Sequence, residues 1–212
     1  MTGEGGVADS DREVLRVSLD VNIWIAHLLA LQHGRKGAAT ELVGIVRDMT
    51  SAAGPIQLVM SWEMIATLED VLGRLQFDAQ SISDFTSSLI LLMKSGPEAF
   101  DPHLLPESGR QLAMKDDEDA AVLASAIAAR VDLLVTNNLE DFVIKESERI
   151  KTRGITLGHQ PAKQLAALIY ERNDGVGIVV AHPIDALTWL TQGLRPSPKN
   201  VRSLGARSSP KP

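Results

Sequence analysis

The sequence contains no cysteine, which excludes disulfides, thiolate zinc sites and a cysteine nucleophile. This composition suits a reducing compartment, so we expect a cytoplasmic protein. Aromatic residues make up only 4% of the 212 residues, so an apolar core must be mainly aliphatic. No apolar run approaches the roughly 20 residues that span a bilayer, and we therefore expect no membrane association.

Net positive charge is also lacking, because the chain carries a formal charge of -6. From Arg195 onward the charged residues are all basic, so the preceding body is more negative still. An acidic body argues against broad, nonspecific nucleic-acid binding. It is equally compatible with carboxylates that hold divalent cations while nearby basic side chains contact phosphates.

Short apolar runs alternate with segments of helical period along most of the chain. The runs that predict buried strands are 14–19, 56–60, 132–136, 155–157 and 177–181. The segments that predict helices are 23–32, 38–49, 62–75, 82–94, 119–130, 162–172 and 184–191, with Ser61 as the N-cap of the third. This alternation predicts an α/β protein whose parallel sheet is covered by helices on both faces.

The domain organisation follows from these elements. We expect a flexible N-terminus over residues 1–13, one domain over 14–194 and a disordered basic tail over 195–212. The stretch 143–175 is longer than the connection expected before a last strand, and we interpret it as an insertion. It would hold an extra helix that serves dimerisation or partner binding.

Polar residues follow two of the predicted strands at their carboxyl ends, where ligands collect in open parallel sheets. Asp20 and Asn22 follow the first strand, and Asn138 and Asp141 follow the strand 132–136. The helix that leads into that strand opens with acidic residues, which include Asp116 and Asp119. Taken alone, each of these groups is also explained as a turn or a helix cap.

Four of these acids, Asp20, Asp116, Asp119 and Asp141, are predicted to converge on a metal. Crowded carboxylates repel, and a divalent cation keeps them ionised. Mg²⁺ or Mn²⁺ prefers oxygen ligands and suits phosphate substrates. The predicted chemistry is hydrolysis of a phosphodiester bond.

Three motifs, in this order, resemble the PIN-domain nucleases and especially their VapC-like toxin branch. They are Leu19-Asp20-Val21-Asn22 after a strand, Asp119-Ala120-Ala121-Val122-Leu123-Ala124 at a helix start, and Thr136-Asn137-Asn138-Leu139-Glu140-Asp141-Phe142. The resemblance covers about 15–142. It implies a three-layer α/β/α sandwich, metal-dependent endoribonuclease activity on RNA, frequent homodimerisation and, for toxins, a cognate antitoxin protein.

One position departs from the family pattern. The family usually has a glutamate in the helix after the second strand, where this sequence has Thr67. Glu63 lies one turn earlier on the same face and Asp70 nearly one turn later. We take Glu63 as the candidate substitute, beside Asn22 and Asn138 as residues that position side chains or water.

Two other functions remain open. If no acid replaces the glutamate, the chain is a PIN-like binding module that has lost catalysis. An aspartate-based phosphatase or phosphotransferase would also place a nucleophilic Asp at a strand end, as Asp20 is placed. Such phosphatases usually carry a second Asp where this sequence has Asn22.

Overall fold

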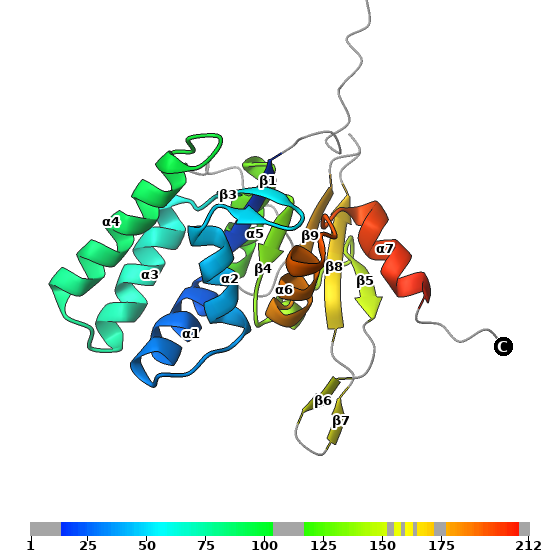
Figure 1. Cartoon of the computed structure of the whole chain (residues 1–212), viewed down its shortest axis with the longest axis horizontal. Helices are drawn as coiled ribbons and strands as arrows, with labels where there is room; N and C mark the ends of the chain where they lie inside the picture. Colours follow the sequence, from blue (N-terminus) through cyan, green and yellow to red (C-terminus); the bar gives the residue numbers. More distant parts are fainter. Residues whose placement is uncertain are drawn as a thin grey trace, which may run out of the picture.

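A seven-stranded sheet forms the centre of the computed structural model (Figure 1), which describes residues 14–103, 117–151, 155–157, 160–162, 165–171 and 177–207. The strand order is β2-β3-β1-β4-β9-β8-β5. The strands are β1 (Leu15–Leu19), β2 (Thr50–Ser51), β3 (Gly54–Leu58), β4 (Leu133–Val135), β5 (Glu148–Lys151), β8 (Leu165–Glu171) and β9 (Gly177–Ala181). The four strands β3, β1, β4 and β9 are mutually parallel, and β2, β8 and β5 pair antiparallel with their neighbours.

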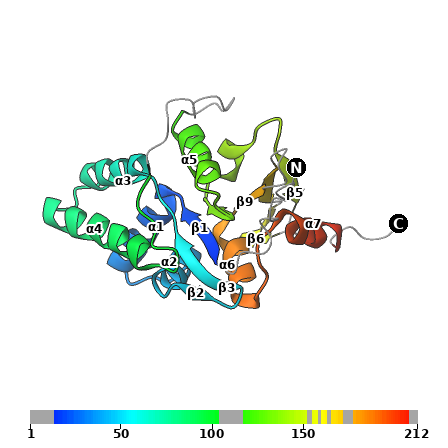
Figure 2. The ribbon, with the colours of Figure 1, turned by 90° about the horizontal axis from the view of Figure 1, so that it is seen from above.

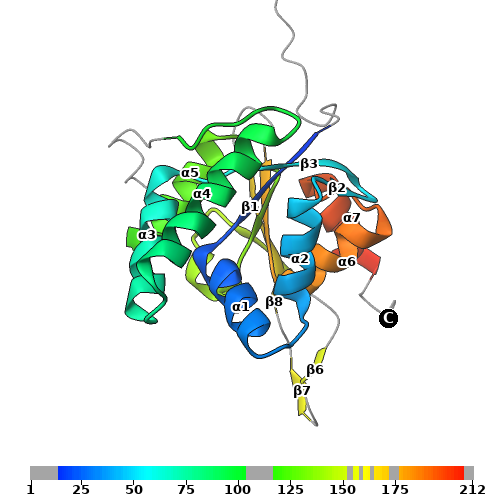
Figure 3. The same ribbon diagram turned by 60° about the vertical axis from the view of Figure 1, so that its left-hand side comes forward.

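Helices cover both faces of this sheet. They are α1 (Val21–Gln32), α2 (Ala38–Arg47), α3 (Trp62–Arg74), α4 (Ala79–Ser95), α5 (Asp117–Ala128), α6 (Pro183–Gln192) and α7 (Pro198–Arg207), with a 3₁₀ helix η3 (Leu139–Phe142) after β4. Figure 3 shows α3, α4 and α5 on one face and α2, α6 and α7 on the other. The expected three-layer α/β/α sandwich with a mostly parallel sheet is confirmed.

The sequence explains why the central strands lie where they do. All residues of β4 are fully buried, as are Leu15, Val17 and Leu19 of β1. Strands covered on both faces consist of nearly continuous apolar runs, as β4 does, whereas β1 alternates Leu15, Val17 and Leu19 with Arg16 and Ser18. The predicted cap of α3 is also confirmed, because the Ser61 hydroxyl accepts a hydrogen bond from the Met64 N–H at 3.2 Å.

The prediction of a helix over 162–172 is wrong. Residues Leu165–Glu171 form β8, which pairs antiparallel with β9 on one side and with β5 on the other. An apolar run of this length fits a buried strand as well as a buried helix. The insertion therefore adds two strands to the sheet and a hairpin, β6 (Ile155–Leu157) with β7 (Gln160–Ala162), which projects from the body (Figure 1).

The prediction of disorder is also wrong for most of the basic tail. Residues Pro198–Arg207 form α7, which lies at the opposite end of the molecule from α3 and α4 (Figure 2). Val201 is completely buried, and the Arg202 guanidinium pairs with Glu148 and Glu171, each at 2.7 Å. The buried Val201 side chain and the two ion pairs of Arg202 therefore dock α7 against the sheet, although α7 has few apolar residues. Residues 1–13 and 208–212 lie outside the described residues.

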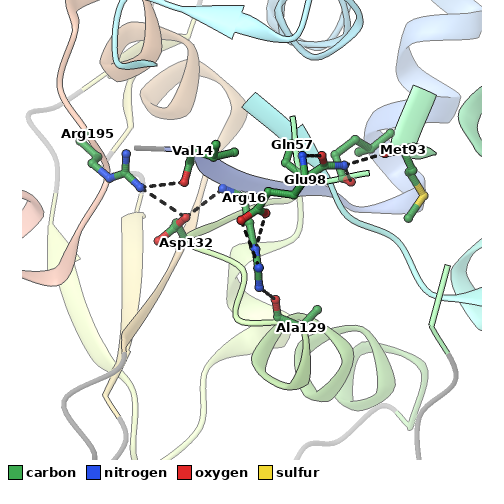
Figure 4. A network of polar contacts seen from close by, with 9 residues as sticks. Val14, Arg16, Gln57, Met93, Glu98, Ala129, Asp132 and Arg195 are labelled. Atoms are coloured by element: carbon green, nitrogen blue, oxygen red, sulfur yellow. Dashed lines mark hydrogen bonds and ion pairs between the residues drawn. The ribbon is translucent and has the colours of Figure 1, made fainter. Parts of the chain in front are cut away.

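Polar contacts fix the edge of the sheet at which β1 and β4 begin (Figure 4). The Arg16 guanidinium pairs with Glu98 at 2.6 Å and donates to the Ala129 carbonyl at the end of α5 at 2.8 Å. The Arg16 N–H donates to Asp132, which also lies 3.7 Å from the Arg195 guanidinium. These contacts hold β1, β4 and α5 together at the amino-terminal edge, which leaves the carboxyl-terminal edge for the candidate site.

Among the described residues, no helix is both long and apolar enough to cross a membrane.

Candidate functional site

Four polar residues follow neighbouring parallel strands at the carboxyl-terminal edge of the sheet. Leu19 pairs with Val135 and Val135 with Ala181, so the next residues, Asp20, Thr136 and His182, share one level. Ser61 follows Leu58 by three residues, as Asp20 follows Val17, and Leu58 pairs with Val17. We call Ser61, Asp20, Thr136 and His182 the edge row; its neighbours lie on strands about 4.8 Å apart.

Asp20 is the most constrained member of the edge row. Its side chain is buried, with 6% relative exposure. One carboxylate oxygen, Oδ2, accepts hydrogen bonds from Asn22 Nδ2 at 2.6 Å and from the Thr136 hydroxyl at 2.7 Å. Its backbone N–H donates to the Val135 carbonyl at 2.9 Å. Hydrogen bonds to an ionised acceptor are the stronger kind, so these two donors fix the carboxylate in one orientation.

Asn22 and Thr136 also tie Asp20 to the turn after β4. Asn22 Nδ2 lies 3.0 Å from the Thr136 hydroxyl, and Asn22 Oδ1 accepts from the Asn137 N–H at 3.2 Å. The Thr136 hydroxyl accepts from the Asn138 N–H at 3.0 Å. Thr136 is a site residue that the sequence pattern does not single out. Its only sequence signal is a β-branched hydroxyl residue that ends an apolar strand directly before two asparagines.

Asn138 and Asp141 lie on the solvent side of this cluster. Both side chains are exposed, and Asn138 is the N-cap of η3 without a side-chain capping bond. The Asp141 N–H donates to the Asn138 carbonyl at 3.1 Å. The Tyr170 hydroxyl donates to the Phe142 carbonyl, and burial raises the pKa of Tyr170, which keeps the hydroxyl protonated as a donor. Strand β8 thereby anchors the end of η3.

The first turn of α5 contributes the next predicted acid. Asp119 is partly buried there, and α5 packs against η3, the element that carries Asp141. His103 Nε2 is hydrogen-bonded to the Ser125 hydroxyl of α5 at 2.8 Å, while the His103 carbonyl accepts from the Trp62 N–H at 3.1 Å. One residue thus joins α5 to the start of α3. Asp116 lies outside the described residues.

The start of α3 carries the candidate for the missing glutamate. Glu63 is exposed in the first turn, two residues after Ser61 of the edge row. Thr67 is half-buried one turn further on. Asp70 is exposed and paired with Arg74 at 2.9 Å along the helix. Of the two acids near Thr67, Glu63 therefore lies closer to the edge row.

The donor set has the chemistry of a Mg²⁺ or Mn²⁺ site. Asp20, Asn22 and Thr136 offer only oxygen atoms as ligands, which hard cations prefer. Within the described parts of the chain, no group of three His, Asp or Glu side chains is gathered closely enough to hold a metal. Asp20 is joined by an amide and a hydroxyl, so the acids that would complete the site lie on α3, α5 and η3.

At the far end of the edge row, His182 caps α6. Its Nδ1 accepts from the Ile184 N–H at 3.4 Å, and burial lowers the pKa of His182, which keeps the ring neutral. One turn on, burial raises the pKa of Asp185 to about 6. The Asp185 Oδ2 atom is buried without a hydrogen-bond partner. A separate pocket of about 360 Å³ lies at the opposite edge, beside Asp132 and Arg195, away from this cluster.

Comparison with known proteins agrees with this geometry. The model of the PIN-domain family matches residues 16–140, which is more than half of the 212-residue chain. The match covers the strand before Asp20, the start of α3, the start of α5 and the turn after β4. A search of curated proteins finds no match.

Proposed function

Because the chain belongs to the PIN-domain family, whose members are generally nucleases, we propose that it is a metal-dependent endoribonuclease that hydrolyses RNA phosphodiester bonds. The observation that carries this proposal is the Asp20 carboxylate at the end of β1, buried and held by Asn22 and Thr136. A carboxylate fixed at the carboxyl edge of a parallel sheet is placed where ligands bind in such folds.

The proposed metal ligands are the four aspartates, Asp20, Asp116, Asp119 and Asp141, with Glu63 in place of the glutamate absent at Thr67. A bound Mg²⁺ or Mn²⁺ makes a water more acidic and offsets charge on the phosphate. Asn22 and Thr136 keep Asp20 aimed at the edge. The exposed Asn138 amide, at the start of η3, would orient the scissile phosphate or the attacking water.

We further propose that the protein acts as the toxin of a toxin–antitoxin pair. The support is the likeness of 136–142 to the VapC-like motif at the turn after β4. A cognate antitoxin protein and a second copy of the chain are the partners that this proposal predicts. Purification from cells that also express the neighbouring gene would test for an antitoxin that co-purifies and inhibits RNA cleavage.

The variant Asp20→Asn tests the nuclease proposal. It keeps the size of the side chain but removes the charge that a metal requires, so we expect RNA cleavage in Mn²⁺ to fall by at least about 100-fold. Asp70→Asn is the matched control, because Asp70 is exposed and paired with Arg74. Equal activity in Asp20→Asn and wild type, with both folded by circular dichroism, would refute the proposal.

A second candidate function is a PIN-like binding module without catalysis. The observation that favours it is Thr67, together with the single carboxylate in the Asp20–Asn22–Thr136 cluster. Calorimetric titration with Mn²⁺ separates the two functions. A folded protein that binds RNA but takes up no Mn²⁺ is the result that this second function predicts.

A further inference from the structure

Trp62 differs from the other Trp, Tyr and Phe side chains in its exposure to solvent. The chain has three Trp, one Tyr and four Phe, and all eight lie in the described ranges. Seven are buried or half-buried, including Trp24 at 1% and Trp189 at 7% relative exposure, whereas Trp62 is 43% exposed. A single exposed apolar side chain needs no explanation by itself. The position of Trp62, directly after Ser61 at the candidate site, suggests a function for it.

Trp62 directly follows Ser61, the member of the edge row beside Asp20. Since β3 pairs in parallel with β1 through Val17 and Leu58, and Ser18 of β1 contacts Met64 in the first turn of α3, Trp62 lies at the start of the helix that packs beside the carboxyl end of β1. The one exposed aromatic residue among the Trp, Tyr and Phe side chains therefore lies on the same edge of the sheet as Asp20.

The backbone that carries Trp62 is fixed in place. Its N–H donates to the His103 carbonyl at 3.1 Å, and Ser61 caps the helix that it begins. The Ser18 hydroxyl of β1 contacts Met64 Sδ at 3.9 Å, which joins the first turn of α3 to the strand that ends at Asp20. Because the backbone at Trp62 is already fixed, only the side-chain freedom of the indole remains to be lost when a flat ligand stacks on it.

We propose that Trp62 is a stacking platform for one unpaired nucleobase of the RNA, next to the phosphate that is cleaved at Asp20. This inference rests on the proposed nuclease function. Base stacking on an aromatic ring tolerates any sequence and requires a single-stranded segment. It also supplies affinity without charge, which a protein with a net charge of -6 needs from a source other than phosphate contacts.

The first experiment measures steady-state cleavage of a single-stranded RNA by wild type, Trp62→Ala and Trp62→Phe. Loss of one stacked base corresponds to about a 5- to 150-fold change. We expect KM for Trp62→Ala to rise within that range while kcat changes by less than about threefold, and Trp62→Phe to recover most of the loss. Leu91→Ala is the matched control, because Leu91 is 65% exposed on α4, away from the edge row.

The second experiment needs no cleavage. In EDTA, titration with the same RNA should quench the tryptophan fluorescence of wild type, since Trp24 and Trp189 are buried and Trp62 alone is accessible. Trp62→Phe should show no quenching. An RNA with one abasic site at the stacked position should bind wild type as weakly as Trp62→Ala binds the intact RNA.

The outcomes separate the two proposals. If wild type neither cleaves nor binds RNA, the nuclease function fails and the stacking role fails with it. If wild type cleaves RNA but Trp62→Ala has an unchanged KM, or loses no more than Leu91→Ala, the stacking role alone is overturned. A Trp62→Ala defect that is equally large on the abasic RNA also overturns it, since Trp62 would then contact something other than the base.

Discussion

Replacing Thr136 by valine tests whether its hydroxyl holds the candidate site together. Valine keeps the branched shape of a residue that is fully buried, so the change removes polar contacts and little volume. The hydroxyl donates to Asp20 Oδ2 at 2.7 Å and accepts from the Asn138 N–H at 3.0 Å. Loss of a hydrogen bond to a charged group costs about 1.5–3 kcal/mol.

With the Asn138 N–H also left without that acceptor, we expect Thr136→Val to lower the free energy of unfolding by about 2–4 kcal/mol. RNA cleavage should fall as well, because Asp20 loses a hydrogen-bond donor that orients its carboxylate. Urea denaturation followed by circular dichroism measures the stability. A change of less than about 0.5 kcal/mol, the scatter of ordinary surface substitutions, would refute the reasoning.

Thr40→Val is the matched control for this substitution. The Thr40 hydroxyl is buried in the first turns of α2 without a hydrogen-bond partner. Removal of an unsatisfied buried hydroxyl should leave the stability unchanged or raise it by up to about 1 kcal/mol. If Thr40→Val and Thr136→Val destabilise the protein equally, the loss at Thr136 comes from the valine itself and not from the contacts of the hydroxyl.

Three further predictions concern the scaffold. Gly96→Ala should lower the free energy of unfolding by about 1–3 kcal/mol, because a Cβ there would lie 2.4 Å from the buried Gln57 side chain. Gly44→Ala is the control: no atom lies within 4 Å of the added Cβ, so it should raise the free energy of unfolding by about 0.5–1 kcal/mol in the same denaturation assay. Burial raises the pKa of Asp185 to about 6 in the folded state, above its unfolded value, so its contribution to stability falls as pH rises from about 4 to 6. Asp185→Asn should therefore make the melting temperature depend less on pH over that window. An unchanged dependence of the melting temperature on pH would contradict the raised pKa. Val201→Ala should cost about 1–3 kcal/mol if α7 is docked, and no loss would mean that it is not.

The parts of the fold that the sequence predicts are those with strong local signals. The apolar residues of β1 and the continuous apolar run of β4 predict these strands, and Ser61 marks the start of α3, because burial and capping leave direct traces in the residue pattern. The alternation of strands and helices also predicts that the central strands are parallel. For the same reason, the placement of Asp20 and of the turn after β4 at one edge is predictable.

Among the elements that the local pattern does not predict, β8 and α7 show the reason most clearly. The segment 165–171 is mainly apolar before Glu171, and only its pairing with β5 and β9 decides that it is a strand. α7 has few apolar residues, and its docking depends on Val201 and on carboxylates of β5 and β8 that are far away in the sequence. Long-range contacts of this kind leave no signal near the residues that make them.

The candidate site likewise combines residues that the local sequence predicts with residues whose roles depend on long-range pairing. Asp20 and Asn22 follow a strand and are predictable as a pair. The role of Thr136 depends on the register of β1 against β4, which places its hydroxyl on the Asp20 carboxylate. The position of Trp62 at the same edge of the sheet as Asp20 depends likewise on the parallel pairing of β3 with β1.

The most direct test of the nuclease account is the dependence of RNA cleavage on Mn²⁺ in the purified wild-type protein. The account predicts that the cleavage rate rises with Mn²⁺ to saturation, disappears in excess EDTA and returns when Mn²⁺ is restored. Cleavage that is equally fast in EDTA, or no cleavage of any single-stranded RNA at saturating Mn²⁺, would contradict it.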